Sequence, residues 1–244
     1  MKRFCVFILS ILLFFTFSCK KEASEKVESP TVKKYATLRI SVYKDKELKN
    51  WAATLEKAEE INFISEEKVL LPDKKNNEIV VAKVKLADDT IGYTNAKYLA
   101  DRPIVFIEDA KLHIRPTVTS SVYTTVPKGT LGFITSEKDG WVEVFIGYLP
   151  NGKWVEGKWA NTGYDDDIGL VVDAARYEKA LNLLNDTSKP DNSKQAETIL
   201  HELSEKQNII GELAIAILNE SVEKSIETVE ADTRTDREKD VENQ

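Results

Sequence analysis

The chain contains very little cysteine and histidine. Its 244 residues include only Cys5, Cys19, His113 and His201 of these two types. Because both cysteines lie within the first nineteen residues, the rest of the chain can form no disulfide bond and offers no thiolate nucleophile. A zinc site built from cysteine and histidine is therefore not expected, and a cysteine–histidine peptidase is excluded. We expect no metal and no cofactor.

The sequence also lacks the short motifs that mark common active sites. It has no glycine-rich phosphate loop, no Gly-x-Ser-x-Gly and no His-Glu-x-x-His. Three consecutive aspartates at 165–167 could be read as calcium ligands, but they lack the spacing of an EF-hand loop, so capping of a following helix explains them better. His113 is expected to be an ordinary strand residue, because no partner base can be named for it. We expect that the protein is not an enzyme.

Positive charge is in the minority. Lysine and arginine number 34 against 41 acidic residues, which gives a formal net charge of −7. Nucleic-acid binding needs a basic stripe, and docking on anionic lipid needs basic patches, so neither is expected of the protein body.

The first nineteen residues combine a basic start with one apolar run. Lys2 and Arg3 precede the apolar residues 4–17, and this run is shorter than the roughly 20 residues that a helix needs to cross a bilayer. Ser18 then precedes Cys19, and the chain turns polar at once. This layout resembles a bacterial lipoprotein signal peptide over residues 1–18. Thr16 and Phe17 depart from the usual pattern before the cysteine. The alternative is an uncleaved N-terminal membrane anchor.

The resemblance implies that Cys19 carries the lipid, with palmitate among its acyl chains. The loose signal is similar to those of spirochaete lipoproteins. Two or more acyl chains hold a protein stably on a bilayer. We therefore expect a lipid-anchored protein of the cell envelope, outside the cytoplasm, on the periplasmic face or the cell surface.

The remainder divides by composition and periodicity. Residues 19–34 are expected to be a disordered tether, and 231–244 a disordered tail. Between them, alternating apolar residues and turn residues predict two β-rich runs, at 35–100 and 104–163. Helical periodicity then covers 165–230.

The second β-rich run carries an ordered set of motifs. Leu-His-Ile-Arg-Pro at 112–116 is followed by Ser-Ser-Val-Tyr at 120–123, a glycine turn at 126–129, Gly-Trp-Val-Glu-Val at 140–144 and a tryptophan-rich end at 153–159. In order and spacing these resemble the bacterial SH3 family.

The first β-rich run repeats the pattern more weakly. It has Leu-Arg-Ile at 38–40 and Ile-Gly-Tyr-Thr-Asn-Ala-Lys-Tyr-Leu at 91–99, but it lacks the central Gly-Trp step. We therefore predict an α+β fold with two small SH3-like β-barrels followed by two to three helices. Gly129 and Gly140 are expected in sharp turns.

The helical segment shows capping signals. The aspartates at 165–167 precede Ile168 and suit a helix N-terminus. Asn192 with Gln195 resembles a capping box for a second helix. Asn208 and Gly211 suggest a turn, although one long helix after Asn192 remains an alternative. The apolar stripes are expected to pack on the barrels.

The SH3 resemblance implies a binding function, since such domains hold extended peptides in aromatic grooves and bacterial members bind peptidoglycan peptides. The candidate groove residues are Arg115, Tyr123, Trp141 and Trp154. Small barrels also use aromatic residues as core, so packing is an equal use for them. The alternative function is structural, with barrels and helices forming one body that contacts another envelope protein. An exposed cleft at Trp141 and Tyr123 would favour binding, and a cleft covered by helices would favour assembly.

Overall fold

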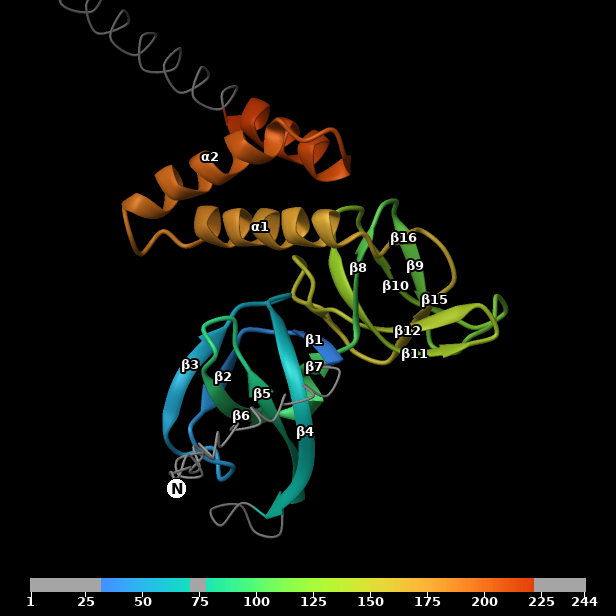
Figure 1. Ribbon diagram of the computed structural model, residues 1–244. Coiled ribbons are helices and arrows are strands. Elements are labelled where there is room, and N and C mark those ends of the chain that lie inside the picture. Colours follow the sequence, from blue (N-terminus) through green and yellow to red (C-terminus); the bar gives the residue numbers. More distant parts are fainter. Residues whose placement is uncertain (1–31, 71–77, 222–244) are drawn as a thin grey trace, which may run out of the picture. The chain divides into compact units, whose positions relative to one another are not determined.

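The computed structural model describes residues 32–70 and 78–221. The chain divides into two units, 1–30 and 31–244, and all described residues belong to the second. The predicted signal peptide, Cys19 and the predicted tail at 231–244 lie outside the described residues. Residues 32–34, assigned to the tether from the sequence, instead form the start of a strand. The described chain is α+β, with two β-rich parts followed by helices, as expected (Figure 1).

The first β-rich part is one antiparallel sheet of seven strands, joined by a short 3-10 helix. Its longest strands, β4 and β5, form a hairpin arm. The elements are β1 (Val32–Ala36), β2 (Ile40–Tyr43), β3 (Trp51–Leu55), β4 (Glu60–Leu70), β5 (Glu78–Lys85), β6 (Ile91–Asn95), η1 (Ala96–Tyr98) and β7 (Leu99–Ala100).

The second β-rich part is a separate seven-stranded sheet plus a two-stranded hairpin. The sheet contains β8 (Arg102–Phe106), β9 (Ala110–His113), β10 (Val122–Val126), β11 (Leu131–Lys138), β12 (Trp141–Phe145), β15 (Lys158–Ala160) and β16 (Tyr164–Asp165), and the hairpin contains β13 (Gly147–Tyr148) and β14 (Trp154–Val155).

The two sheets have the same strand order. The first reads β3-β2-β6-β5-β4-β1-β7 and the second reads β10-β9-β15-β12-β11-β8-β16. When the hairpin β13–β14 is set aside, each strand of the second sheet takes the place of the strand at the same position in the first. The hairpin is therefore an insertion between the fifth and sixth strands of the second sheet.

The irregularities of the two sheets also coincide. Ala52 in β3 and Tyr123 in β10 are extra residues that interrupt the pairing with the neighbouring strand. Ile64 in β4 and Thr135 in β11 interrupt pairing in the same way. A β-bulge bends its strand and is fixed by local structure. Two bulges thus occupy matching positions in both sheets.

Each sheet encloses its own apolar cluster. Alternation along the strands places Val42 and Val84 inside the first, and Val142 and Val144 inside the second, all less than 5% exposed. Burying a large side chain of this kind contributes about 1.5–3 kcal/mol. Each sheet therefore has a core of its own.

Helix α1 (Ile168–Asn185) begins as the aspartates predict. The Asp167 carboxylate accepts a hydrogen bond of 2.8 Å from the Leu170 N–H, which satisfies a free donor of the first turn. Asp165 belongs to β16, and Asp166 pairs with Arg102. The capping interpretation of this triplet is confirmed.

The second helix starts differently from the sequence prediction. Helix α2 (Asp191–Ser204) has no side-chain cap, so the capping box of Asn192 and Gln195 is wrong. Asn192 is buried inside the first turn, and its Nδ2 donates to the backbone and side-chain oxygens of Asp186. The amide therefore ties α2 to the end of α1 instead of capping α2.

A third helical run, residues 209–221, follows a break after Ser204. Asn208 Oδ1 accepts from the N–H groups of Ile210 and Gly211, and its Nδ2 donates to Asp173 on α1. The turn suggested by Asn208 is thus present, and the segment after Asn192 is not one continuous helix.

The helices pack on both sheets through a shared apolar core, as the stripes predict. This core contains Val105, Phe133 and Phe145 of the second sheet and Tyr35 and Ala100 of the first. Its helical members include Leu170, Tyr177, Leu200, Leu203 and Ile210. In the described chain, no helix is long and apolar enough to span a bilayer.

Candidate binding site

The inserted hairpin presents an exposed aromatic side chain on a firm base. Tyr148 in β13 is 72% exposed, and its ring packs edge-on against Trp154, with 4.9 Å between ring centroids. Trp154 packs edge-on in turn against Phe145, which belongs to the shared core. Edge-to-face pairs add about 0.5–1.5 kcal/mol beyond area burial. The hairpin is thus fixed, with one aromatic face open.

Polar contacts hold the hairpin on the second sheet. The Tyr123 hydroxyl donates to the Trp154 carbonyl at 2.9 Å, and the Lys153 ammonium lies 4.0 Å from the centre of the Tyr123 ring. The Trp154 indole N–H donates to Glu156 and lowers the pKa of that carboxyl group. The structure therefore brings together two of the residues chosen from the sequence, Tyr123 and Trp154, as supports of the hairpin.

The other two chosen residues lie in the loop after β9 and at the start of β12. Trp141 is 8% exposed and packs edge-on against His113, with 5.1 Å between centroids. His113 Nδ1 lies 3.0 Å from the Ser120 carbonyl oxygen, so its ring is satisfied within a strand, as expected. Arg115 is exposed in the loop after β9. Trp141 thus offers little surface to a ligand in this structure.

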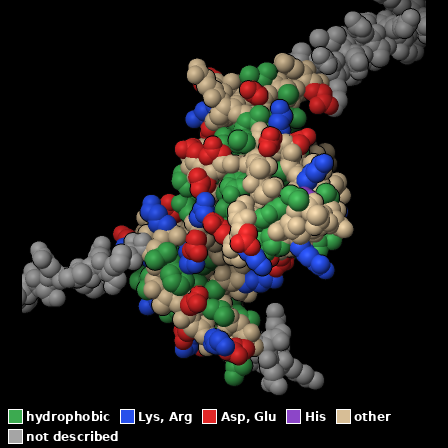
Figure 2. Space-filling model, turned by 90° about the vertical axis from the view of Figure 1, so that its right-hand side faces the viewer, with side chains coloured by type: hydrophobic (Ala, Val, Ile, Leu, Met, Phe, Trp, Pro, Cys, Tyr) green, Lys and Arg blue, Asp and Glu red, His purple; other side chains and the backbone are tan. Residues whose placement is uncertain are grey.

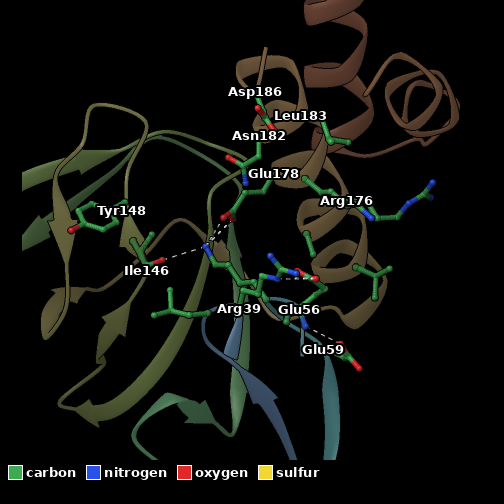
Figure 3. Close-up of a pocket in the computed structure, with 16 residues that line it drawn as sticks. Arg39, Glu56, Glu59, Ile146, Tyr148, Arg176, Glu178, Asn182, Leu183 and Asp186 are labelled. Carbon is green, nitrogen blue, oxygen red and sulfur yellow. Dashed lines mark hydrogen bonds and ion pairs between the residues drawn. The ribbon is translucent and has the colours of Figure 1, made fainter. Parts of the chain in front are cut away.

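A groove of about 840 Å³ opens beside the hairpin (Figure 3). We call it the junction groove because three parts of the chain line it. The first sheet supplies Leu38 and the turn 56–59, the second part supplies Ile146 and Tyr148, and α1 supplies its face from Val172 to Leu183. Ligand pockets commonly measure about 300–1,000 Å³.

Lys57 lies at the base of the junction groove. Its ammonium donates to the Ile146 carbonyl at 3.2 Å and to both carboxylate oxygens of Glu178, at 3.0 and 2.8 Å (Figure 3). The Lys57 side chain is only 16% exposed. The turn that presents it contains Ala58 in the left-handed region, with φ of 66°. One cation therefore connects all three walls of the groove.

Charges of both signs surround this base. Arg39 pairs with Glu56 through Nε at 3.2 Å, and both side chains are well exposed. Arg176 reaches out to Glu202 on α2. At the far end, Asp186 accepts hydrogen bonds from Ser188, which lower the pKa of its carboxyl group. The groove thus offers cations, anions and apolar side chains together.

The described residues hold no cluster of three side chains that could bind a metal ion. Figure 2 shows acidic and basic side chains interspersed on one face, without a continuous basic stripe. The sequence did not point to Lys57, Glu178 or Arg39, because only tertiary packing brings their segments together. The one usable signal was the Pro-Asn-Gly turn at 150–152, which closes the hairpin that carries Tyr148.

Comparison with known proteins shows the family of this chain. The family model described as Lipoprotein LenA matches residues 6–232, which is most of the chain. The match defines a bacterial lipoprotein of the cell envelope. The chain belongs to the Lipoprotein LenA family.

Among solved structures, one titled "Structure of NlpC2 from Trichomonas vaginalis" aligns with 12% identity and a TM-score of 0.23. The alignment covers 64% of this chain and 56% of that one, so the chain spans little more than half of its length. No curated protein matches the chain.

Proposed function

We propose that this lipoprotein binds an extended peptide of the cell envelope by means of two divergent SH3-like modules. The equal strand order of the two sheets and their matching bulges support a repeated unit. The modules correspond to residues 35–100 and 104–163, and the lipid on Cys19 holds them at a membrane.

The observation that carries the proposal is the exposed ring of Tyr148 at the edge of the junction groove. A fixed tyrosine gives a large contact area at low cost in conformational entropy. The hairpin that bears it is an addition to the common unit, and the same addition builds one wall of the groove. The inserted hairpin β13–β14 is thus part of the wall of the junction groove.

The charges of the groove select the class of peptide. The Arg39 guanidinium pairs with Glu56 through Nε and its side chain is 72% exposed, so it is accessible to a carboxylate of a ligand. Asp186 lies at the carbonyl end of α1, where the helix dipole favours cations. A short peptide with a free carboxylate and a free amine therefore matches the groove. Stem peptides of the cell wall carry both groups.

The test uses the soluble protein without its signal and lipid. Peptide-free glycan strands and stem peptides are prepared separately from purified peptidoglycan, and the stem peptides are titrated by calorimetry. Tyr148→Ala should weaken binding about tenfold, which is typical of an anchor residue, because it removes the ring without disturbing a core.

Trp51→Ala is the matched control, since Trp51 is also a highly exposed aromatic residue, on the first sheet. Acetylation of the peptide amines should weaken binding to the native protein as well. Unchanged affinity in Tyr148→Ala, or no binding of stem peptides at all, would contradict the proposal.

A second candidate is contact with another envelope protein. It is favoured by three exposed apolar residues at the end of the β9–β10 hairpin, Ile114, Val118 and Val122, which are 51%, 75% and 47% exposed. Exposed apolar side chains gathered at one hairpin end are typical of interaction surfaces. In this case Val118→Asp would abolish capture of an envelope protein, while Tyr148→Ala would leave capture unchanged.

A further inference from the structure

Three aromatic residues line up across the outer face of the first sheet. Trp51 in β3 lies opposite Tyr43 in β2, and Tyr43 lies opposite Tyr93 in β6. Residues opposite one another in a sheet point to the same face. Val42, Gly92 and Thr94 alternate with them and are buried, so the aromatic set faces outward. We call these three residues the aromatic row.

The aromatic row is open to solvent. Trp51 is 61% exposed, and Tyr43 and Tyr93 are half-buried. The indole N–H of Trp51 donates to the Thr54 hydroxyl at 3.3 Å, which restrains the ring over the sheet. Neighbouring strands lie about 4.8 Å apart, so the row extends about 10 Å across the strands. It forms a shallow linear platform rather than a pocket.

Polar groups flank this platform. Ser41 and Thr54 face each other in the adjacent register position, on the same side of the sheet. Lys83 continues the row beyond Tyr93, and it makes no ion pair within the part of the chain that the structure describes. Hydroxyl groups and one cation thus lie beside the aromatic row.

The second sheet has a different row at the same position. At the positions of Trp51, Tyr43 and Tyr93, the second sheet carries Val122, His113 and Trp159, in that order. At the position of Lys83 it carries Glu143. There, Trp141 covers the ring of His113. The open aromatic platform therefore belongs to the first sheet, and it is not a necessary part of the shared fold.

We propose that the aromatic row binds a glycan chain, by stacking of sugar rings on Trp51, Tyr43 and Tyr93. Sugar rings have apolar C–H faces that pack on aromatic faces and hydroxyl rims that bond to polar groups, as Ser41 and Thr54 provide. Lys83 suits a carboxylate on such a sugar. The aromatic row is separate from the junction groove. Glycan binding there therefore rests on the proposed function only for the location of the protein in the cell envelope.

Charge distinguishes the glycan from other flat or extended ligands. Platforms for single-stranded nucleic acid combine stacking with a basic groove, whereas this chain carries a net charge of −7. The same charge opposes docking on an anionic bilayer. An added peptide strand would need a regular edge, but β3 contains the bulge at Ala52, a feature that protects edges from pairing.

The experiment measures tryptophan fluorescence of the soluble protein during titration with chitotetraose and, separately, with peptide-free glycan strands from peptidoglycan. The chain has four tryptophans, and Trp51 is the most exposed of them. We expect the glycan to protect Trp51 from acrylamide quenching. Calorimetric titration with the same glycans compares the variants, because Trp51→Ala and Trp51→Phe lack the fluorescent reporter. Trp51→Ala should weaken binding about tenfold, as expected for the loss of one stacked ring, and Trp51→Phe should retain much of it.

Tyr148→Ala is the control and should bind glycan like the native protein. Circular dichroism of each variant checks that the sheets remain folded. Equal glycan binding by native protein and Trp51→Ala would overturn the proposal, as would the absence of binding to both glycans. Protection of Trp51 by stem peptides alone would also overturn it. Loss of peptide binding in Tyr148→Ala with normal glycan binding separates this site from the junction groove.

Discussion

The ammonium of Lys57 lies 2.8 Å from Oε2 of Glu178, and this ion pair joins a turn of the first sheet to helix α1. The same ammonium donates to the Ile146 carbonyl of the second part. A cation that is 16% exposed has lost most of its hydration, so its partners must replace it. The pair therefore holds together the walls of the junction groove.

This relationship predicts measurable coupling. In a double-mutant cycle with Lys57→Ala and Glu178→Ala, we expect an interaction of about 1–2 kcal/mol in the free energy of unfolding. The comparison pair is Arg39 and Glu56, whose side chains are 72% and 64% exposed. Solvent screening should limit that pair to about 0.2–1 kcal/mol. Equal coupling in both pairs would show that Lys57 is not a connecting group.

Substitution of two glycines tests whether the third helical run packs on the second sheet. Gly129 and Gly140 both have positive φ, at 82° and 78°, as their predicted turns require. A Cβ at Gly129 would lie 2.3 Å from Leu213 Cδ1, whereas a Cβ at Gly140 meets open space. Gly140→Ala should cost about 1–2 kcal/mol from backbone strain alone.

Gly129→Ala should cost about 1–3 kcal/mol more than Gly140→Ala, because the end of the Leu213 side chain, which packs against the shared core, must shift. Chemical denaturation of the two variants gives the difference directly. If the two costs are equal, the helical run does not pack on this turn.

We predict that ionisation of the Tyr177 hydroxyl lowers the stability of the protein at alkaline pH. Burial in the shared core raises the pKa of this hydroxyl. Because the folded pKa exceeds the unfolded value of about 10, the stabilising contribution is complete below that pH and is lost as pH rises through the folded pKa. Tyr177→Phe should therefore show a smaller loss of stability between neutral and strongly alkaline pH. An identical pH profile would contradict the burial of the hydroxyl.

We predict that lipid on Cys19 holds the protein at the envelope. Replacement of Cys19 by Ala should remove the acyl chains and leave a form that is unprocessed or no longer partitions into detergent. Phase partition of labelled cells gives the result, with Cys5→Ala as the control, since Cys5 lies inside the predicted signal. Unchanged partition and processing in Cys19→Ala would favour an uncleaved membrane anchor.

Local patterns in the sequence were good predictors of local structure. The two β-rich runs at 35–100 and 104–163 were expected from alternation, and β5 and β12 are regular strands within them. Asp167 caps its helix because a cap depends only on the next three residues. The glycine turns follow for the same reason, since positive φ is a property of one residue in its turn.

Relations between distant segments could not be predicted in this way. Asn192 is of a residue type that commonly caps helices, but its amide binds Asp186, at the end of the preceding helix, instead. Trp141 could be a groove residue or a core residue from the sequence alone, and its packing on His113 comes from a different strand. The aromatic row combines Tyr43, Trp51 and Tyr93, and only the strand register places these residues side by side.

Binding of a peptide ligand in the junction groove is our principal proposal. Its most direct test is a titration of the isotope-labelled soluble protein with cell-wall stem peptides, followed by the chemical shifts of backbone amides. We predict saturable changes that cluster at Ala58, Tyr148 and Glu178, which line the groove on its three sides. Changes confined to His113 and Trp141, or no saturable change at any peptide concentration, would contradict the account.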